Sequence, residues 1–554
     1  MKKNLSLSPS LRSIKSIPLI FLLTFYFSSV LNLSFWRFVY EKIPLEDTGN
    51  WLFLFSLIIF IAAPLFLFFN LIVCKYIAKP LLAFFLLASS SANYYMFTFG
   101  IYIDKDMIRN VFETNTREAL DLVTLSGFLW VFLTGVIPAL LIVFTKIKYF
   151  NLRKEILWRI ALVLTISLIT GVVSVPTYKE YAAFGRNNQN VRKLLNTINY
   201  TYSTFRHFQL QQLRKRQFKI LDKNAKIVPD EDNYKTLLVL IIGETARAKN
   251  FSLDGYERKT NPLLEKQDIV YFNSTASCGT ATAVSLPCMF SHMSRNNFDN
   301  NDAAYTENVI DILQKSGYDI LWRENDDGCK GVCKRVPIEE MVKINNPKYC
   351  NGTYCYDEAL LDGLEEKIKN IKTDTVIVLH TMGSHGPTYY KRYPEKFKVF
   401  MPTCDTADIQ TCTQEEIINT YDNTILYTDH FISSVIDIVK KYPQHEAGVW
   451  YVSDHGESLG ENNIYLHGLP YGIAPMEQKE VPMLIWMNNI MKKWNYINYD
   501  CLKKNAKTNE YSHDNLFHSL LGLLEIKTTE YNKKFDLFKN CRTKPLSHIY
   551  EGNK

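Results

Sequence analysis

Uncharged apolar runs dominate the first third of the chain and stop near residue 178. Runs long enough to cross a bilayer, which takes about 20 apolar residues, cover residues 17–35, 51–73, 80–103, 122–145 and 160–178. Because lipid offers no hydrogen-bond partner to a backbone amide, each run is expected to be a helix. We therefore expect a helical transmembrane domain of five helices over residues 1–178.

Lysine and arginine in the short flanks predict how these helices are oriented. Ten such residues lie on the side of the membrane that holds the amino terminus, and five lie on the opposite side. The more positive side is cytoplasmic, so five spans place everything after residue 178 outside the membrane. A cleaved signal peptide is the alternative for the first run. Its apolar stretch is long, however, no small-residue cleavage site follows it, and four more runs come after it.

Short β-branched runs replace the long apolar ones after residue 233. They are LLVLII (237–242), IVYF (269–272), YDILW (318–322), TVIVLH (375–380), GVWYVS (448–453) and MLIW (483–486). Helix-like segments separate them, which predicts an α/β domain with a mostly parallel sheet between helices over residues 234–554. Residues 179–233 mix aromatic, leucine and basic residues at helical spacing. They are predicted to be bridging amphipathic helices on the membrane surface, with a solvated linker as the alternative.

Cysteine placement indicates an oxidising compartment for the second half. Ten of the eleven cysteines follow residue 270, and an even set of this kind is typical of disulfides. We expect neighbours to pair, because short loops close most easily; a zinc site formed by Cys329, Cys333, Cys350 and Cys355 is the alternative. The formal charge of +7 is dispersed, which fits an anionic lipid surface and gives no reason to expect a nucleic-acid partner.

Three of the predicted strands run into side chains that can bind a metal ion. LLVLII leads to Glu244, GVWYVS leads to Asp454 and His455, and TVIVLH leads to a segment that contains His385. In open parallel sheets the carboxyl ends of the strands form the ligand site. Two carboxylates and an imidazole suit zinc or manganese. Taken alone, Glu244 is better explained as an acid at a helix amino terminus and Asp454 as a helix cap, but three converging strand ends favour a metal site.

A nucleophile is expected in the segment SCGTATAVSLPCMF, residues 277–290. Its small residues predict a rigid loop leading into a helix, whose amino terminus favours a phosphate. A threonine hydroxyl becomes a useful nucleophile when a metal lowers its pKa. A disulfide between Cys278 and Cys288 would lock the loop around Thr280, our candidate. Without the metal set, a serine- and threonine-rich capping loop would be the better interpretation.

Taken together, these motifs resemble the phosphoethanolamine transferases of Gram-negative bacteria. That family modifies lipid A, includes the mobile colistin-resistance enzymes, and has a catalytic domain similar to sulfatases and alkaline phosphatase. The matching segments are IIGETARAKNFSLDGY, SCGTATAVSLPCMFS, LWRENDDGCKGVC, MGSHGP and YVSDHGESLGENNIYLHGLPYG. The resemblance covers the whole chain.

The resemblance implies a set of site residues. It makes Glu244, Thr280, Asp454 and His455 the zinc ligands, with Thr280 also the nucleophile. His385 and His467 would bind a second zinc or transfer protons, and Lys330 would contact the substrate phosphate. Asn110, Thr114 and Glu118 share one face of a predicted helix and would hold the ethanolamine group. Asp327 stands where some members have a small polar residue, so the resemblance gives it no role.

The implied reaction takes phosphoethanolamine from phosphatidylethanolamine, releases diacylglycerol and modifies a lipid A phosphate, which confers polymyxin resistance. The implied enzyme is a zinc-dependent monomer of the bacterial inner membrane, with its catalytic domain in the periplasm. The alternatives are a phosphoglycerol transferase, for which manganese is usual, or transfer to another acceptor such as a core sugar, glycan or protein. A hydrolase and a catalytically inactive scaffold rank lower, because the membrane anchor and the metal set argue against them.

Overall fold

The computed structural model describes residues 13–43, 50–104, 107–108, 111, 125–213, 216–228, 234–407 and 409–544. The chain divides into two compact units, Met1–Lys215 and Arg216–Lys554. The break between them falls inside the segment that the sequence predicts to bridge two domains.

Within the described residues, the first unit contains five helical stretches long and apolar enough to cross a membrane. They are Ser16–Lys42, Asn50–Ile72, Ala78–Thr98, Leu125–Phe144 and Leu152–Ser174. The first consists of α1 (Ser16–Ser29) and α2 (Leu33–Lys42), joined by a turn of 3₁₀ helix. The membrane part of the predicted fold class is therefore confirmed.

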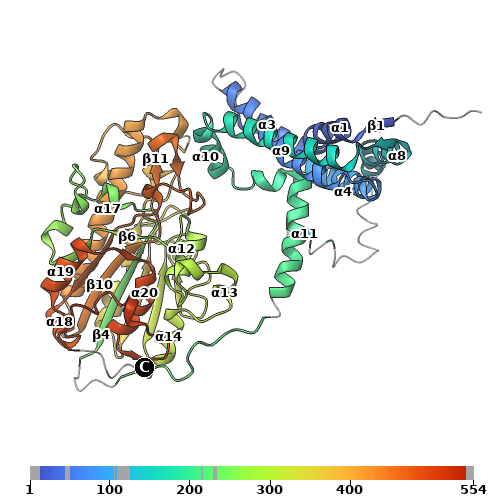
Figure 1. Ribbon diagram of the computed structural model, residues 1–554. Coiled ribbons are helices and arrows are strands. Elements are labelled where there is room, and N and C mark those ends of the chain that lie inside the picture. The colour runs from blue at the N-terminus through green and yellow to red at the C-terminus, as the bar shows by residue number, and fades with distance from the viewer. Residues whose placement is uncertain are drawn as a thin grey trace, which may run out of the picture. The chain divides into compact units, whose positions relative to one another are not determined.

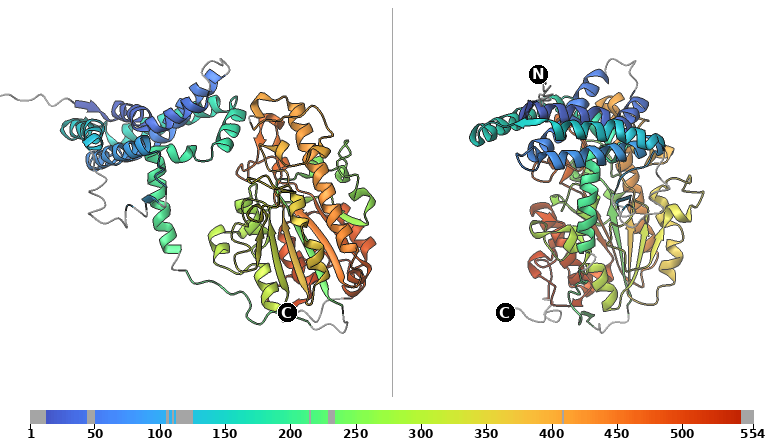
Figure 2. Two further views of the ribbon diagram at one scale, coloured as in Figure 1. Left: turned by 180° about the vertical axis from the view of Figure 1, so that it is seen from behind. Right: turned by 90° about the vertical axis from the view of Figure 1, so that its right-hand side faces the viewer.

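The apolar helices pack side by side (Figure 2). The helix α3 (Asn50–Ile72) contacts α1 and α9 (Leu152–Ser174), while α4 (Ala78–Phe99) contacts α7 (Leu125–Val131) and α8 (Ile137–Phe144). Leu23, Phe27 and Phe69 are fully buried among them. The α4 helix ends before the predicted limit at residue 103, because Gly100 takes a left-handed backbone conformation with φ of 66°.

The fifth helix begins at Leu152, earlier than the apolar run that starts at residue 160. Arg159 lies inside it and pairs with Glu155 at 2.9 Å. The Arg159 guanidinium also donates to the backbone carbonyls of Asn70 and Val73 at 2.5 and 2.6 Å. Hydropathy alone left residues 152–159 out of the predicted helix because it takes no account of these partners, which compensate the burial of both charges.

Two helices follow in the bridging segment, α10 (Tyr178–Asn187) and α11 (Asn196–Leu213). The start of α11 is tied to the apolar helices by Asn196. Its side-chain amide donates to the carbonyls of Leu31 and Ser89 at 2.7 and 2.8 Å, and its backbone amide donates to the Asn32 side chain at 2.9 Å. These buried bonds make the first turn of α11 a part of the first unit.

The second unit is built on a seven-stranded sheet with the order β5-β13-β10-β4-β9-β7-β8 (Figure 1). Its strands are β4 (Thr236–Gly243), β5 (Ile269–Phe272), β7 (Asp319–Glu324), β8 (Ile338–Glu340), β9 (Thr375–His380), β10 (Glu446–Ser453) and β13 (Met483–Met487). From β10 to β8 all neighbours are parallel, and β13 runs antiparallel to both of its neighbours. The predicted mostly parallel sheet is confirmed.

Helices cover both faces of this sheet, which explains why its central strands are apolar throughout. Leu238 and Leu240 of β4 point into a core shared with α12 (Thr282–Met289), α14 (Val309–Ser316) and α20 (Asp514–Leu523). The long helix α17 (Gln414–Lys440) contacts β10 on the opposite face (Figures 1 and 2). A capping box at Thr413 begins α17.

Five disulfides lock loops of the second unit. They join Cys278 to Cys288, Cys329 to Cys333, Cys350 to Cys355, Cys404 to Cys412, and Cys501 to Cys541. Neighbour pairing is therefore confirmed, and the alternative zinc site made of four of these cysteines is wrong. Cys74, in the first unit, is free and exposed.

Candidate active site

The carboxyl ends of three neighbouring strands bring the predicted ligands together. In the ladder between β10 and β4, Ser453 pairs with Gly243, so Asp454 and Glu244 follow at the same level. On the other side of β4, Ile242 pairs with His380 at the end of β9. Glu244 therefore stands in the middle of the row, between the residues that follow β10 and those that end β9.

Glu244, Asp454 and His455 are fully buried. The Nε2 atom of His455 lies 3.4 Å from Glu244 Oε1 and 3.5 Å from Asp454 Oδ2. The other ring nitrogen, Nδ1, is 2.9 Å from the carbonyl oxygen of Gly456 and donates to it. This bond fixes the ring so that Nε2 faces the carboxylates, which is the usual way a metal-binding histidine is oriented.

The charges of this cluster fit a bound cation. Asp454 Oδ1 accepts from the amides of Thr245 and His455, but its buried Oδ2 has no hydrogen-bond partner among the described residues. Burial and the charge of Glu244 raise the pKa of Asp454 to about 7. Burial lowers the pKa of His455, but Asp454 and Glu244 outweigh it and raise that pKa to about 10. A divalent cation bound to these groups would remove the repulsion and satisfy the unpaired oxygen.

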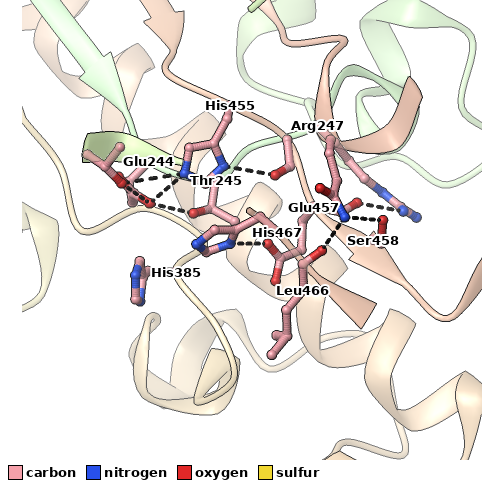
Figure 3. A network of polar contacts seen from close by, with 12 residues as sticks. Glu244, Thr245, Arg247, His385, His455, Glu457, Ser458, Leu466 and His467 are labelled. Carbon is pink, nitrogen blue, oxygen red and sulfur yellow. Dashed lines mark hydrogen bonds and ion pairs between the residues drawn. The ribbon is translucent and has the colours of Figure 1, made fainter. Parts of the chain in front are cut away.

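A fourth side chain, His467, lies beside this group of possible ligands (Figure 3). Glu244, His455 and His467 each place a ligand atom within 4.8 Å of the others. The Nδ1 atom of His467 lies 2.6 Å from Glu457 Oε2, and the other oxygen of Glu457 accepts from Tyr389 at 2.5 Å. The Glu457 carboxylate thus orients the ring of His467.

The threonine beside this cluster is Thr282, not Thr280. Thr282 is the first residue of α12, and its Oγ1 lies 3.0 and 3.2 Å from the two oxygens of Glu244 and 3.4 Å from His455 Nε2. Thr280 donates its hydroxyl to the carbonyl of Leu469 at 2.6 Å. The prediction that Thr280 lies against the metal ligands is therefore wrong. Both threonines are followed by alanine, and the point where the helix begins decides which of them faces the ligands.

The backbone around Glu244 is strained at Thr245 and closely packed against the loop that carries Gly383. Thr245 has a left-handed backbone with φ of 61°, a strained conformation for a β-branched residue. Its hydroxyl donates to Glu244 Oε1 at 2.6 Å, which holds the carboxylate in place. A Cβ atom at Gly383 would lie 2.5 Å from the backbone oxygen of Glu244, so the loop after β9 can pass only as glycine. Such strain is typical of functional sites.

Comparison with known proteins identifies the family. The family model described as phosphoethanolamine transferase EptA/EptB matches residues 61–212, and the sulfatase model matches residues 236–526. The chain is 43% identical to phosphoethanolamine transferase EptA of Escherichia coli strain K12 over 546 residues, covering 98% of this chain and 99% of that one. The chain belongs to the phosphoethanolamine transferases.

Two further relatives agree with this assignment. Phosphatidylethanolamine transferase Mcr-2 of Escherichia coli is 34% identical over 93% of this transferase and 96% of its own length. The solved structure of lipooligosaccharide phosphoethanolamine transferase A from Neisseria meningitidis, an integral membrane protein, is 39% identical. It has a TM-score of 0.64 and covers 96% of this chain and 99% of that one. The transferase is thus an inner-membrane protein whose catalytic unit lies in the periplasm, as its sequence predicts.

Of the remaining predicted site residues of the transferase, the structure places His385, His467 and Lys330. The rings of His385 and His467 are neighbours, with centroids 5.6 Å apart (Figure 3). Lys330 donates to the carbonyl of its neighbour Asp327 at 2.5 Å. The predicted ethanolamine-binding residues Asn110, Thr114 and Glu118 lie outside the described residues.

Sequence reasoning missed the carboxylates that support the histidines. Glu457 is visible in the sequence motif, but its partner His467 is ten residues away and only the fold joins them. Asp357 accepts from the backbone amides of Met382 and Gly383 at 2.8 and 3.0 Å and so fixes the loop that carries His385. No local signal marks Asp357, because it follows a disulfide loop rather than a strand.

His513 ties the threonine loop to the sheet. Its Nδ1 accepts from the amide of Cys278 at 3.0 Å, and its Nε2 donates to the carbonyl of Ser453 at 2.9 Å. The bond from Cys278 requires the neutral ring, because a protonated Nδ1 cannot accept. Burial, with a smaller contribution from His455, lowers the pKa of His513 to about 4.

His513 should therefore make the catalytic unit sensitive to acid. In the unfolded chain His513 takes up a proton near pH 6.5, and in the folded chain only near pH 4. Its contribution to the free energy of unfolding is therefore fully present above pH 6.5 and is lost as the pH falls toward 4. At pH 5 the loss is about 2 kcal/mol. Thermal unfolding of the detergent-solubilised protein at pH 7 and pH 5 measures it. His513→Gln keeps one acceptor and one donor but cannot titrate, so its unfolding temperature should fall less between the two pH values. An equal fall would exclude this role.

Proposed function

We propose that this transferase moves phosphoethanolamine from phosphatidylethanolamine to a phosphate of lipid A through a covalent intermediate on Thr282. One observation carries the proposal. The Thr282 hydroxyl, at the start of a helix, lies within hydrogen-bond reach of both Glu244 and His455. In a member of this family, a buried hydroxyl in that position is the group best placed to attack a phosphorus atom. Polymyxin resistance of a host would follow from the added positive charge on lipid A.

Zinc is the ion that the proposed ligand set suits best. Glu244, Asp454 and His455 would hold it, with the hydroxyl of Thr282 in the position that the sequence assigned to Thr280. A mixed carboxylate and imidazole set suits zinc and, less well, manganese. When bound, the ion lowers the pKa of an adjacent hydroxyl and offsets negative charge on phosphoryl oxygens.

In the first half of the reaction, Thr282 Oγ1 forms a bond to the donor phosphorus and the bond from phosphorus to the diacylglycerol oxygen breaks. The threonine proton is released to water, because Glu244 and His455 would be holding the ion. A protonated His385 or His467 gives its own proton to the departing oxygen, so free diacylglycerol leaves, and that histidine takes up a proton again from solvent. The unpaired amides in the first turn of α12 face the start of the helix and favour phosphoryl oxygens there. Lys330 would add a compact positive charge.

In the second half, an oxygen of the acceptor phosphate attacks the same phosphorus. The bond to Thr282 breaks and the threonine regains its proton. A covalent intermediate of this kind predicts ping-pong kinetics. Asn110, Thr114 and Glu118 are proposed to hold the ethanolamine group in both halves, with Glu118 paired to its ammonium.

The acceptor is tested by expression in a Gram-negative host whose lipid A is unmodified. Mass spectrometry of isolated lipid A should show the mass of one added phosphoethanolamine, and the same host with the Thr282→Ala variant should show none. Adducts on the core sugars with unmodified lipid A would reject lipid A as the acceptor. Radiolabelled phosphatidylethanolamine should yield labelled diacylglycerol and a label that stays with the protein when no acceptor is present.

A further inference from the structure

A second group of metal-ligand side chains shares Glu244. Glu244, Asp326 and His380 each place a ligand atom within 4.8 Å of the others. They follow or end the strands β4, β7 and β9, which are adjacent in the order β4-β9-β7. Asp454 and His455 follow β10, the neighbour of β4 on its opposite side. The two groups therefore extend in opposite directions along the sheet edge from the one carboxylate they share.

His380 is prepared to bind a ligand through one ring nitrogen. Its Nδ1 lies 2.9 Å from both carboxylate oxygens of Glu324. Its Nε2 is fully buried and has no hydrogen-bond partner among the described residues. A buried ring nitrogen without a partner is costly. A histidine that donates one N–H to a carboxylate and keeps the other nitrogen free is the usual arrangement in metal sites.

The carboxylate behind His380 is itself fixed. Glu324 Oε2 accepts from the indole of Trp322 at 2.9 Å, and Oε1 accepts from the backbone amide of Asp326 at 2.8 Å. Glu324 is 4% exposed and His380 is fully buried. These bonds hold the ring in one orientation before any ligand binds, with an oxygen of Asp326 already within 4.8 Å of its ligand atom.

Charge also favours a cation here. Glu244, Glu324 and Asp326 bring three carboxylates around one imidazole. Two cationic side chains lie close by and offset part of this charge, but their hydrogen bonds go to other groups. Lys330 donates to the backbone carbonyl of Asp327, and Arg392 donates to that of His385 at 2.8 Å and to the Thr388 hydroxyl at 2.9 Å. A divalent cation would balance the excess of negative charge and bind the unpaired nitrogen.

We propose that Glu244, Asp326 and His380 bind a second divalent cation, so that Glu244 bridges two ions. One imidazole nitrogen and two carboxylates suit zinc or manganese. Ligand bonds of about 2.0 to 2.6 Å allow two ligands of one ion to lie as far apart as these atoms do. The site is distinct from any position that His385 and His467 supply. It rests on the proposed function only in that Glu244 also holds the first ion.

The test compares metal content of the purified full-length protein and three variants. After chelation and titration with zinc, atomic emission should give two bound ions per chain for the wild type and for His385→Gln. His380→Gln should bind one, and His455→Gln should lose the first ion. Loaded with manganese, the wild type should give the electron paramagnetic resonance spectrum of a spin-coupled pair, and His380→Gln that of isolated ions.

The Glu324→Gln variant tests the site indirectly. It changes the carboxylate behind His380 and leaves all three proposed ligands in place. It should bind the second ion about 10- to 100-fold more weakly while the first isotherm is unchanged. One ion in the wild type, or zinc isotherms of His380→Gln and Glu324→Gln that match the wild type, would overturn the proposal. If His380→Gln fails to fold by circular dichroism, Glu324→Gln alone decides. A wild-type protein that binds the first ion but forms no phosphoethanolamine intermediate on Thr282 would instead count against the proposed function.

Discussion

Replacing Thr282 with alanine should lower phosphoethanolamine transfer by about a thousandfold or more, the scale on which enzymes lose activity without their nucleophile. The reason is that Thr282 places its hydroxyl 3.0 Å from Glu244 and 3.4 Å from His455 Nε2, whereas the nearby hydroxyl of Thr245 is bonded to Glu244 Oε1. Thr280→Ala should keep transfer within about tenfold of the wild type, because its hydroxyl is bonded to the carbonyl of Leu469 and not to the ligands.

These two threonines make a matched pair, since each is followed by alanine and both lie between Cys278 and Cys288. Transfer is followed by release of labelled diacylglycerol, and the modified residue is located by mass spectrometry of the labelled protein. Thr282→Ser should restore part of the activity. A phosphoethanolamine group on Thr280, or an inactive Thr280→Ala with an active Thr282→Ala, would contradict the assignment.

Replacing Asp454 with asparagine should lower metal affinity by more than about a hundredfold, beyond what loss of a supporting residue costs. The substitution removes the negative charge at Oδ2, the buried oxygen left unpaired in this structure. Bound metal is measured after dialysis against a chelator. Transfer should fall with it and return when excess zinc is added, if the variant still binds weakly.

Asp429→Asn is the control for this change. Asp429 is equally buried, and burial raises its pKa to about 7 as it does for Asp454. Asp429 lies in α17, where it accepts from the amides of Leu263 and Leu264. The Asp429→Asn substitution should therefore leave the metal content unchanged. Full metal occupancy in Asp454→Asn would remove Asp454 from the ligand set.

The strand ends could be predicted because their signal is local. A buried parallel strand is apolar along its whole length, so a carboxylate or imidazole at its carboxyl end is conspicuous, and the topology of such sheets brings those ends together. Glu244, Asp454 and His455 were found in this way. The pairing of the cysteines was predicted for a similar reason, since short loops close at the lowest entropic cost.

What the sequence could not give depends on contacts between distant segments. Glu324 and His380 are 56 residues apart, yet they form the support of the second metal group. The choice between Thr280 and Thr282 depended on a helix boundary, which sequence patterns locate only to within a few residues. The early start of α9 could not be predicted, because it depends on hydrogen bonds from Arg159 to the carbonyls of Asn70 in α3 and Val73 just after it.

In all five disulfides each cysteine is joined to the next one along the catalytic unit. A polypeptide exported amino terminus first presents its thiols to the oxidase in that same order. Pairing by order of arrival therefore gives the native set without reshuffling, so production of active protein should need an oxidase but little isomerase.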